Sequence, residues 1–419
     1  TATNDQGKVT FNVNHTAKGN FGADGAALNT VEVIDAKTLT IQKDAGKLYV
    51  NNVTATGNGT AKIEFQGANY EIHANIGTDA NKFAEVNFKG DIANATTFKL
   101  MAGKTIHSTA VDLAKTNAVD NTLELYEGSS IVGDVTTTSA NNGFLSVKGD
   151  AVTVSSIGVG GAINQVKFDE AKILTVTENT VNANAGINFI KDGTLALTKA
   201  AALDITQAVI VAKSDANGLG SITVNNATAG QLVKFAQIGD VAVADTSLKL
   251  LAATGGANVE LNGTASIIKL DLGSSNAEVR LTKANGDYLI KDLAHTQGKA
   301  SLVLEKNVTL KEGTNLGNAL DYIQINSKDL RVENGVNLSA TNGIRSNAVG
   351  IVNLIFDGDS TVSGVVGSNN TLGNVTINST NKAKTVDFLN KFNIAGDLVI
   401  ANTDTAILRG EVFAANIQG

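Results

Sequence analysis

The sequence predicts an all-β fold, a right-handed parallel β-solenoid (β-helix) with coils of about 20–24 residues. Three observations lead to this prediction: the 419 residues include no proline, apolar positions recur at a steady spacing, and the apolar residues are mostly small aliphatics. Proline has no backbone N–H, so it interrupts a strand ladder wherever it falls inside one. A chain without proline therefore indicates that most backbone N–H groups take part in strand pairing.

The spacing of the apolar anchors supplies the period. Three series recur along the chain: Leu125, Val147, Phe168 and Phe189; Leu261, Leu281, Leu304 and Ile325; and Phe356 and Ile377. Every step within a series is 20 to 23 residues long, which is typical of a solenoid with one coil per repeat. The period slips between Phe189 and Leu261, and again between Ile325 and Phe356. We predict insertions or loops at both slips.

Further short alternating segments follow the anchors, such as Val152–Val154 after Val147 and Thr361–Ser363 after Phe356. Two or three such strands fill a coil, and each would pair with its equivalent in the next coil, about 4.8 Å away. The right-handed sense follows from the general preference for right-handed crossover connections. The main exception is Thr198–Ser214, whose pattern allows either a helix or an Ala-rich coil.

The sequence predicts a first part of the solenoid over residues 1–254 and its continuation over residues 255–419. The segment Gly255–Asn258 (GGAN) is the candidate for a soft joint between them, and one continuous domain is the alternative. The chain starts at Thr1 without a methionine or a signal peptide, so we expect a processed product or a fragment. No apolar run approaches the length needed to span a bilayer, so no transmembrane segment is expected.

Charge and composition exclude several classes of function. The net charge is −7, and arginine occurs only at Arg280, Arg331, Arg345 and Arg409. A nucleic-acid partner is not expected, because its phosphates would require clustered Lys and Arg. The absence of cysteine excludes disulfides, thiol catalysis and thiolate metal sites.

Gly-Asp is the most repeated local motif. It occurs at Gly90-Asp91, Gly133-Asp134, Gly149-Asp150, Gly239-Asp240, Gly286-Asp287, Gly358-Asp359 and Gly396-Asp397. We interpret it as a coil corner, in which glycine adopts a positive φ and the aspartate accepts hydrogen bonds from nearby backbone N–H groups. The alternative is a ladder of calcium ligands, but calcium requires six or more oxygens at close range. No cofactor is therefore predicted, and calcium is kept as the alternative.

Two acidic pairs were weighed as catalytic or calcium-binding groups. Asp357 and Asp359 stand two residues apart, so they would share one side of a strand. Paired carboxylates on a β-helix can cleave polysaccharide or bind calcium. Because Phe356 points toward the core, Asp357 is expected to face solvent and Asp359 to belong to a turn. Asp169-Glu170 is interpreted in the same way, as a solvated corner.

Other polar motifs also favour structural roles. The four histidines, His15, His73, His107 and His295, are far apart in sequence and lack a metal-ligand spacing. The glycine-rich Gly158–Asn164 (GVGGAIN) lacks a following Lys-Ser/Thr, so we predict a coil turn rather than a phosphate loop. No catalytic, cofactor-binding or metal-binding residue is predicted.

Asparagine also occurs in Asn-X-Ser/Thr triplets. Examples are Asn52, Asn94, Asn226, Asn262, Asn307 and Asn374. Such triplets are glycosylation acceptors in secreted eukaryotic proteins. In a chain this rich in Asn and Thr, chance occurrence is the favoured interpretation, and Asn at equivalent positions of successive coils can instead stack as side-chain amide ladders.

The segment Leu354–Ile377 reads LIFDGDSTVSGVVGSNNTLGNVTI. It resembles the recurring coil of the large surface autotransporters of rickettsial type, the outer-membrane protein A and B or surface cell antigen family. The matching positions are Phe356, Gly358, Asp359, Val362, Gly364, Val366, Gly367, Leu372, Gly373, Val375 and Ile377. The stretch Thr403–Ile417 is similar to coils of the same passengers, and Val166–Thr177 and Ile187–Leu197 resemble them more loosely.

The resemblance implies an exported passenger on the outer face of a bacterial outer membrane, acting as an adhesin or forming a paracrystalline surface layer. The expected role is thus a non-enzymatic structural protein. Expected partners are further copies in a lattice or filament, or a host or neighbouring cell surface. A solenoid has open strand edges at its ends, so self-association or further chain is expected there. The alternatives are a polysaccharide-active β-helix enzyme and a phage or fimbrial fibre segment.

Overall fold

The computed structural model describes residues 5–90, 95–113, 121–139, 142–199, 201–211, 215–225, 229–243, 245–273, 276–295, 300–317, 320–326, 329–378, 383–401 and 403–419. The chain forms two compact units, Thr1–Lys199 (the first unit) and Ala200–Gly419 (the second unit), and each is described by itself. In the described residues both units consist of strands and turns, without a helix.

The first unit contains short strands joined by tight turns. They are β1 (Gln6–Phe11), β2 (His15–Ala17), β3 (Leu28–Val33), β4 (Thr38–Gln42), β5 (Lys47–Leu48), β6 (Val50–Ala55), β7 (Lys62–Gln66), β8 (Tyr70–Ile72), β9 (Asn75–Ile76), β10 (Phe83–Phe88), β11 (Thr96–Leu100), β12 (Thr105–Asp112), β13 (Asn121–Leu125), β14 (Ser130–Thr136), β15 (Phe144–Val147), β16 (Val152–Ile157), β17 (Gln165–Phe168), β18 (Ile173–Val176), β19 (Ile187–Phe189) and β20 (Thr194–Leu197).

The second unit continues with strands of similar length. They are β21 (Leu203–Ile205), β22 (Val209–Val211), β23 (Leu219–Val224), β24 (Leu232–Phe235), β25 (Leu248–Ala253), β26 (Asn258–Leu261), β27 (Ala265–Asp271), β28 (Ala277–Leu281), β29 (Gly286–Ala294), β30 (Ala300–Leu304), β31 (Val308–Leu310), β32 (Leu320–Ile325), β33 (Asp329–Val332), β34 (Ile344–Ser346), β35 (Asn353–Phe356), β36 (Ser360–Val362), β37 (Val375–Ile377), β38 (Thr385–Phe388), β39 (Phe392–Asn393), β40 (Asp397–Ile400), β41 (Thr405–Leu408), β42 (Val412–Phe413) and β43 (Asn416–Gln418).

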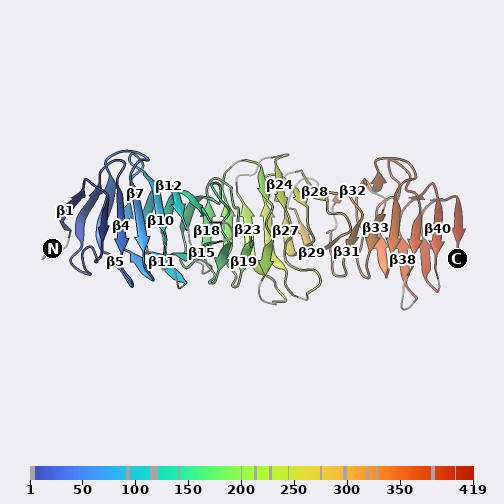
Figure 1. Ribbon diagram of the computed structural model, residues 1–419. Coiled ribbons are helices and arrows are strands. Elements are labelled where there is room, and N and C mark those ends of the chain that lie inside the picture. The colour runs from blue at the N-terminus through green and yellow to red at the C-terminus, as the bar shows by residue number, and fades with distance from the viewer. Residues whose placement is uncertain are drawn as a thin grey trace. The chain divides into compact units, whose positions relative to one another are not determined.

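Each strand pairs in parallel with its equivalent one coil further along the chain. In the first unit β4, β7, β10 and β12 form one such ladder, and they stand side by side in Figure 1. In the second unit β24, β26, β28, β30, β32 and β34 form another. This stacking confirms the predicted parallel β-solenoid. Its right-handed sense stays a prediction.

The predicted anchors face one another in the strand register. The partners include Leu125 with Val147, Phe168 with Phe189, Leu261 with Leu281, Leu281 with Leu304, Leu304 with Ile325, and Phe356 with Ile377. All of these anchors are fully buried. The sequence period was therefore the true stacking period, because an inward-facing residue must lie above its equivalent in the previous coil.

Coil length varies more widely than predicted. Hydrogen-bonded residues of adjacent coils are 19 positions apart at Ser247 and Ser266, and 30 positions apart at Asn75 and Thr105. Most steps fall within the predicted range, and the longer ones contain insertions between strands.

The two slips in the period have different causes. Leu203 pairs with Val233, 30 residues later, so an insertion lies within the first slip as predicted. The insertion predicted between Ile325 and Phe356 is wrong. Ile325 stands opposite Ser346, whereas Phe356 stands opposite Val332. The two anchors belong to different ladders of the same coil stack, and no step connects them.

Aromatic side chains stack from coil to coil inside the core. In the first unit the rings of Phe168 and Phe189 are stacked at 4.7 Å between centroids. In the second unit Phe356 meets Phe388 edge to face at 5.8 Å. All four side chains are buried. Large rings bury much apolar area in a narrow interior, so these contacts stabilise both units strongly.

The Gly-Asp motifs only partly follow the predicted corner chemistry. At Gly239 φ is +59°, and the Asp240 carboxylate accepts the N–H of Ala242, as expected for a corner. Gly133, Gly149, Gly286, Gly358 and Gly396 lack a positive φ, so that part of the prediction is wrong for them. Gly149, Gly358 and Gly396 still lie in bends between strands, whereas Gly133 and Gly286 lie within β14 and β29. A Cβ on Gly358 would lie 2.4 Å from the Cα of Asn334, in the preceding coil. At such positions glycine is needed because neighbouring coils approach closely. Asp91 lies outside the described residues.

Several of these aspartates bind the next coil rather than their own turn. Asp134 accepts the backbone N–H groups of Val159 and Gly160, at 3.2 and 2.8 Å. Both donors belong to the predicted turn Gly158–Asn164, which lies in the following coil. Asp359 likewise accepts the N–H of Thr385 at 2.7 Å. These carboxylates thus link successive coils by accepting hydrogen bonds from backbone N–H groups.

A ladder of amides and carboxylates runs along the second unit, as predicted for asparagine. It contains Asn307, Asp329, Asn353, Asn374, Asp397 and Asn416, each bonded to the next. Asn353, for example, donates to Asp329 and accepts the backbone N–H of Asn374. Of the triplet asparagines, Asn94 and Asn226 lie outside the described residues.

The stretch Thr198–Ser214 contains β21 and β22 and no helix in its described residues, so the helix alternative is wrong. Gly255–Asn258 follows β25 and ends at the first residue of β26, inside the second unit, and the division at residue 254 stays a prediction. In the part of the chain that the structure describes, no helix is long and apolar enough to cross a membrane.

Candidate functional site: a polar face on the second unit

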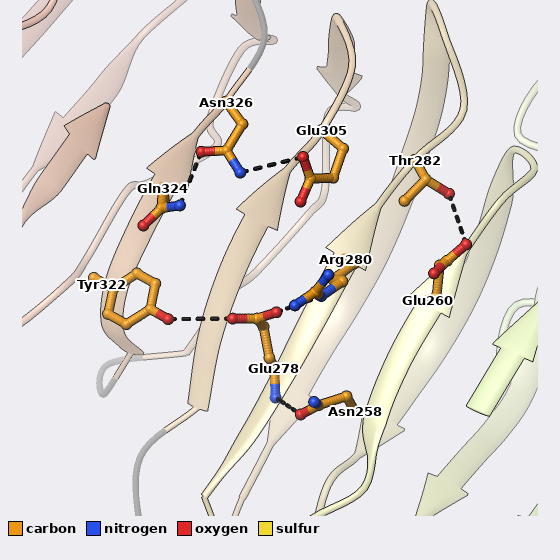
Figure 2. Close-up of polar contacts among 9 residues, drawn as sticks. All are labelled: Asn258, Glu260, Glu278, Arg280, Thr282, Glu305, Tyr322, Gln324 and Asn326. Carbon is orange, nitrogen blue, oxygen red and sulfur yellow. Dashed lines mark hydrogen bonds and ion pairs between the residues drawn. The ribbon is translucent and has the colours of Figure 1, made fainter. Parts of the chain in front are cut away.

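The outward face of β26, β28, β30 and β32 carries the most connected group of polar side chains (Figure 2). Alternation along each strand sends Val279 and Leu281 into the core and leaves Glu278 and Arg280 outside. Because equivalent strands lie side by side, outward side chains of successive coils form rows across the sheet. We call this surface the polar face.

Glu278 is the centre of the polar face. It accepts a hydrogen bond from Arg280 Nε on its own strand and one of 3.2 Å from the Tyr322 hydroxyl, two coils away. Figure 2 shows this second bond crossing the intervening strand, β30. The outward side chains of β30, Ser301 and Val303, are only 6% and 3% exposed. In the strand register Ser301 lies opposite Glu278 and Val303 opposite Arg280, so the long side chains of β28 lie beside them.

The strand register is irregular next to Tyr322. The pairing of β30 with β32 is regular from Leu302 onward but shifts between Ala300 and Leu302. The irregularity places an additional residue of β32 opposite β30. Tyr322 immediately precedes the regular pairs and stands opposite Ser301, which pairs with Glu278.

The other carboxylates on the polar face each have their own donor. Thr282 donates its hydroxyl to Glu260 at 3.4 Å, and Asn326 donates to Glu305 at 3.2 Å. Gln324 donates in turn to Asn326 at 2.8 Å. The carboxylates are spread along successive strands and bonded separately, so no two of them share a proton or a ligand in this arrangement.

Arg345, on β34, completes the polar face. Its guanidinium carbon lies 3.5 Å from the centroid of the Tyr322 ring, and its Nε donates to Gln324 Oε1 at 3.0 Å. Stacking of a cation on an aromatic ring is favourable and fixes the plane of the guanidinium. The polar face is thus a network of side-chain contacts with a cation, Arg345, at one end.

Asp357 and Asp359 are bound by separate cations, and so is Asp169 of the second acidic pair. Arg331 donates to both oxygens of Asp357, at 2.8 and 2.7 Å. Asp359 is 3.3 Å from Lys384. Asp169 is likewise paired with Lys148, at 3.2 Å. Each carboxylate serves to link neighbouring coils.

Two histidines also pair locally. His73 is 3.3 Å from Glu71, and His107 is 3.0 Å from Asp79. In the described ranges, no group of three His, Cys, Asp or Glu residues could hold a metal ion. The expectation of no metal site stays a prediction.

One pocket of about 220 Å³ lies elsewhere in the second unit. Val209, Val211, Gln237 and Thr246 contribute to its mainly apolar lining. Its carboxylate, Asp240, is already bonded to the N–H of Ala242. The pocket therefore lacks a pair of acidic groups for sugar cleavage.

Sequence reasoning missed the polar face because its members are far apart in the chain. Arginine positions were noted only as scarce, and Tyr322 was not singled out. The available signal was the 21-residue step from Gln324 to Arg345, which equals the period of the neighbouring anchors.

Similar proteins support the resemblance noted from the sequence. Outer membrane protein B of Rickettsia japonica is 27% identical over 431 residues, covering 97% of this chain and 24% of that protein. Outer membrane protein B of Rickettsia conorii is 27% identical over 442 residues, covering 96% of this chain and 25% of that protein. Outer membrane protein A of Rickettsia rickettsii is 25% identical over 402 residues, covering 87% of this chain and 17% of that protein.

The predicted relationship to rickettsial outer membrane proteins A and B is confirmed. The chain spans about a quarter of the length of the B-type relatives. No protein-family model matches the chain, and no solved structure does. The names of the relatives agree with the predicted location at a bacterial cell surface.

Proposed function

We propose that this relative of the rickettsial outer membrane proteins A and B is a non-enzymatic structural protein of the outer face of an outer membrane. It forms part of a surface layer or coat and has an adhesive role. The observation that supports this proposal most is the polar face, where outward side chains are linked from coil to coil into an extended surface. Its relatives are named as outer membrane proteins, which supports the location.

A solenoid suits this role because its outer surface is repetitive. Equivalent side chains recur about every 4.8 Å along the stack, so contacts with a neighbour can repeat in register. The side-chain hydrogen bonds between coils hold these rows in place, as in the ladder from Asn307 to Asn416. Repeat proteins commonly use such extended surfaces for binding.

The alternative function that an experiment has to exclude is enzymatic cleavage of polysaccharide. It requires a carboxylic acid and a second carboxylate placed on either side of one bond. On the polar face Glu278 is bonded to Arg280 and Tyr322, which fits a structural role. The purified chain and a Glu278→Gln variant should release no reducing ends from a panel of polysaccharides. Release by the native chain that is lost in the variant would establish an enzyme.

Immunogold electron microscopy of intact producing cells tests the surface role. Antibodies against this chain should label the whole cell surface densely, and brief protease treatment of intact cells should remove the label. Thin sections should show the label on an ordered layer. Label restricted to sparse projections would support an adhesin without a coat, and label only inside the cell would overturn the proposal.

A further inference from the structure

Arg345 differs from the other arginines of the chain. Arg280 pairs with Glu278, Arg331 with Asp357, and Arg409 with Asp387. Among the residues that the structure describes, Arg345 has no carboxylate partner. Its recorded contacts are the Tyr322 ring and the Gln324 side chain, both of which are uncharged.

The guanidinium of Arg345 is ordered in advance of any ligand. Tyr322, on which it stacks, is held by its hydroxyl bond to Glu278. Gln324, which accepts from Arg345 Nε, is held by its own bond to Asn326. The side chain therefore has little freedom left to lose on binding, which lowers the entropic cost of an added contact.

The neighbour of Arg345 in the following coil is a glycine. Ile344 bridges to Val366 in the next coil, so the residue beside Arg345 in that coil is Gly367, which has no side chain. A Cβ on Gly367 would lie 2.0 Å from the backbone oxygen of Asn393. The packing of the following coil thus requires glycine here, and Arg345 stays partly exposed.

A planar guanidinium with free terminal N–H groups fits a carboxylate, which it can bind through two parallel hydrogen bonds. The chain makes this contact within itself between coils. Arg409 donates through Nε and through a terminal nitrogen to Asp387, 22 residues earlier. At Arg345 the Nε is already bonded to Gln324, so a carboxylate of another molecule would bind through the terminal nitrogens.

We propose that Arg345 binds a carboxylate of a second copy of this chain and forms a side-to-side contact in the surface coat. Charge complementarity favours this partner, because the chain carries 40 acidic and 33 basic residues and so presents an excess of carboxylates. The inference rests on the proposed coat function and specifies one of its contacts.

Sedimentation velocity of the purified chain over a range of concentrations tests this contact. Arg345→Gln should weaken self-association about three- to tenfold, as expected for the loss of one charge-assisted pair, and Arg345→Lys should restore part of it. Lys234→Gln is the matched control, since it removes one positive charge from β24, a more distant strand of the same sheet. Circular dichroism of each variant checks that the fold is retained. Equal association of native chain and Arg345→Gln, or equal weakening by Lys234→Gln, would overturn the proposal.

A binding experiment with an acidic oligosaccharide tests whether Arg345 binds the carboxylates of a glycan instead of those of a second copy. Oligogalacturonate should bind the native chain and the Arg345→Gln variant equally. If instead it binds through Arg345 while self-association is unchanged in the variant, the partner is an acidic glycan and a second copy is excluded. Immunogold labelling separates the two proposals: a labelled coat with unaffected association contradicts only the Arg345 contact, whereas unlabelled cells contradict the coat itself.

Discussion

Each of the two units buries one tyrosine completely, but the hydroxyl groups of these two tyrosines differ in their hydrogen bonding. Tyr70 in the first unit and Tyr288 in the second are both 0% exposed. Each ring fills space that a glycine leaves open. A Cβ on Gly46 would lie 1.9 Å from Tyr70, and one on Gly286 would lie 2.9 Å from Tyr288. The apolar fit is therefore similar in the two units.

The polar ends differ. The Tyr288 hydroxyl donates to the backbone oxygen of Leu261 at 3.1 Å and accepts the N–H of Lys283 at 3.2 Å. The Tyr70 hydroxyl has no hydrogen-bond partner among the described residues. A buried hydroxyl without a partner costs free energy of folding, whereas a bonded one does not.

On the outer surface, among the described residues, it is the first unit whose polar groups are paired and the second that has a group without a partner of opposite charge. In the first unit Glu71 lies 2.9 Å from Lys47 and 3.9 Å from Lys99, so this outward row pairs its charges. In the second unit Arg345 faces outward without a carboxylate. The first unit thus leaves a polar atom unsatisfied inside, and the second leaves a cation available outside. Hydrogen bonding inside the core and charge pairing on the outer surface therefore differ independently between the two units.

Truncation of a stacked core aromatic should have the largest effect, and it should be equal in the two units. Phe168→Ala and Phe356→Ala should each cost about 3–5 kcal/mol, because each leaves a large cavity in a narrow interior. Urea unfolding followed by hydrogen exchange of peptides from each unit measures the loss locally. Val13→Ala, at a position that is 58% exposed, is the control and should change little. A loss below about 1 kcal/mol at either phenylalanine would contradict the shared core design.

The second-largest loss of stability is expected at the glycines where neighbouring coils approach closely. Gly149→Ala in the first unit and Gly358→Ala in the second should each cost about 1–3 kcal/mol, because the new Cβ meets backbone rather than a flexible side chain. Gly19→Ala is the control, since nothing lies within 4 Å of its Cβ position. Equal stability of all three variants in urea would show that the coils can separate without cost.

The sequence was sufficient for the stacking but not for these contacts. The anchors from Leu261 to Ile325 were predicted with their true partners, because inward residues repeat with the coil. Gly358 lies in a bend as predicted but without the positive φ, and its close approach to Asn334 was not predicted, since local turn rules say nothing of the coil beneath. The Tyr322–Arg345 contact was missed because it joins side chains of two adjacent coils, β32 and β34, and composition counts alone do not show which polar side chains meet.

A smaller effect should separate the two buried tyrosines. Tyr288→Phe should cost about 1 kcal/mol, because the Lys283 N–H loses its bond to the hydroxyl. Tyr70→Phe should be neutral or stabilising, because it removes an unpaired hydroxyl from the core. Urea midpoints of the two variants measure the difference. A similar loss in both would mean that the Tyr70 hydroxyl is satisfied, and the contrast between the units would disappear.

The smallest effect concerns the outward charges and appears as a dependence on pH. The hydrogen bond from Lys47 lowers the pKa of Glu71, aided by His73 and opposed by partial burial. Its stabilising contribution is therefore complete above the ordinary glutamate pKa and is lost as pH falls through the lowered value of the folded state. Glu71→Gln should cost less than about 1 kcal/mol at pH 7 and should flatten the decline in stability at acid pH.

The matched variant is Arg345→Gln, which should leave the acid decline unchanged because no described carboxylate pairs with Arg345. Thermal unfolding of both variants between pH 3 and 7 at low and high salt measures the contrast, and added salt should weaken the Glu71 effect. If Arg345→Gln flattened the acid decline as much as Glu71→Gln, a carboxylate of the same chain would have to neutralise Arg345. Arg345 would then be unavailable to a carboxylate of a second copy. The two units would no longer differ in the pairing of their outward charges.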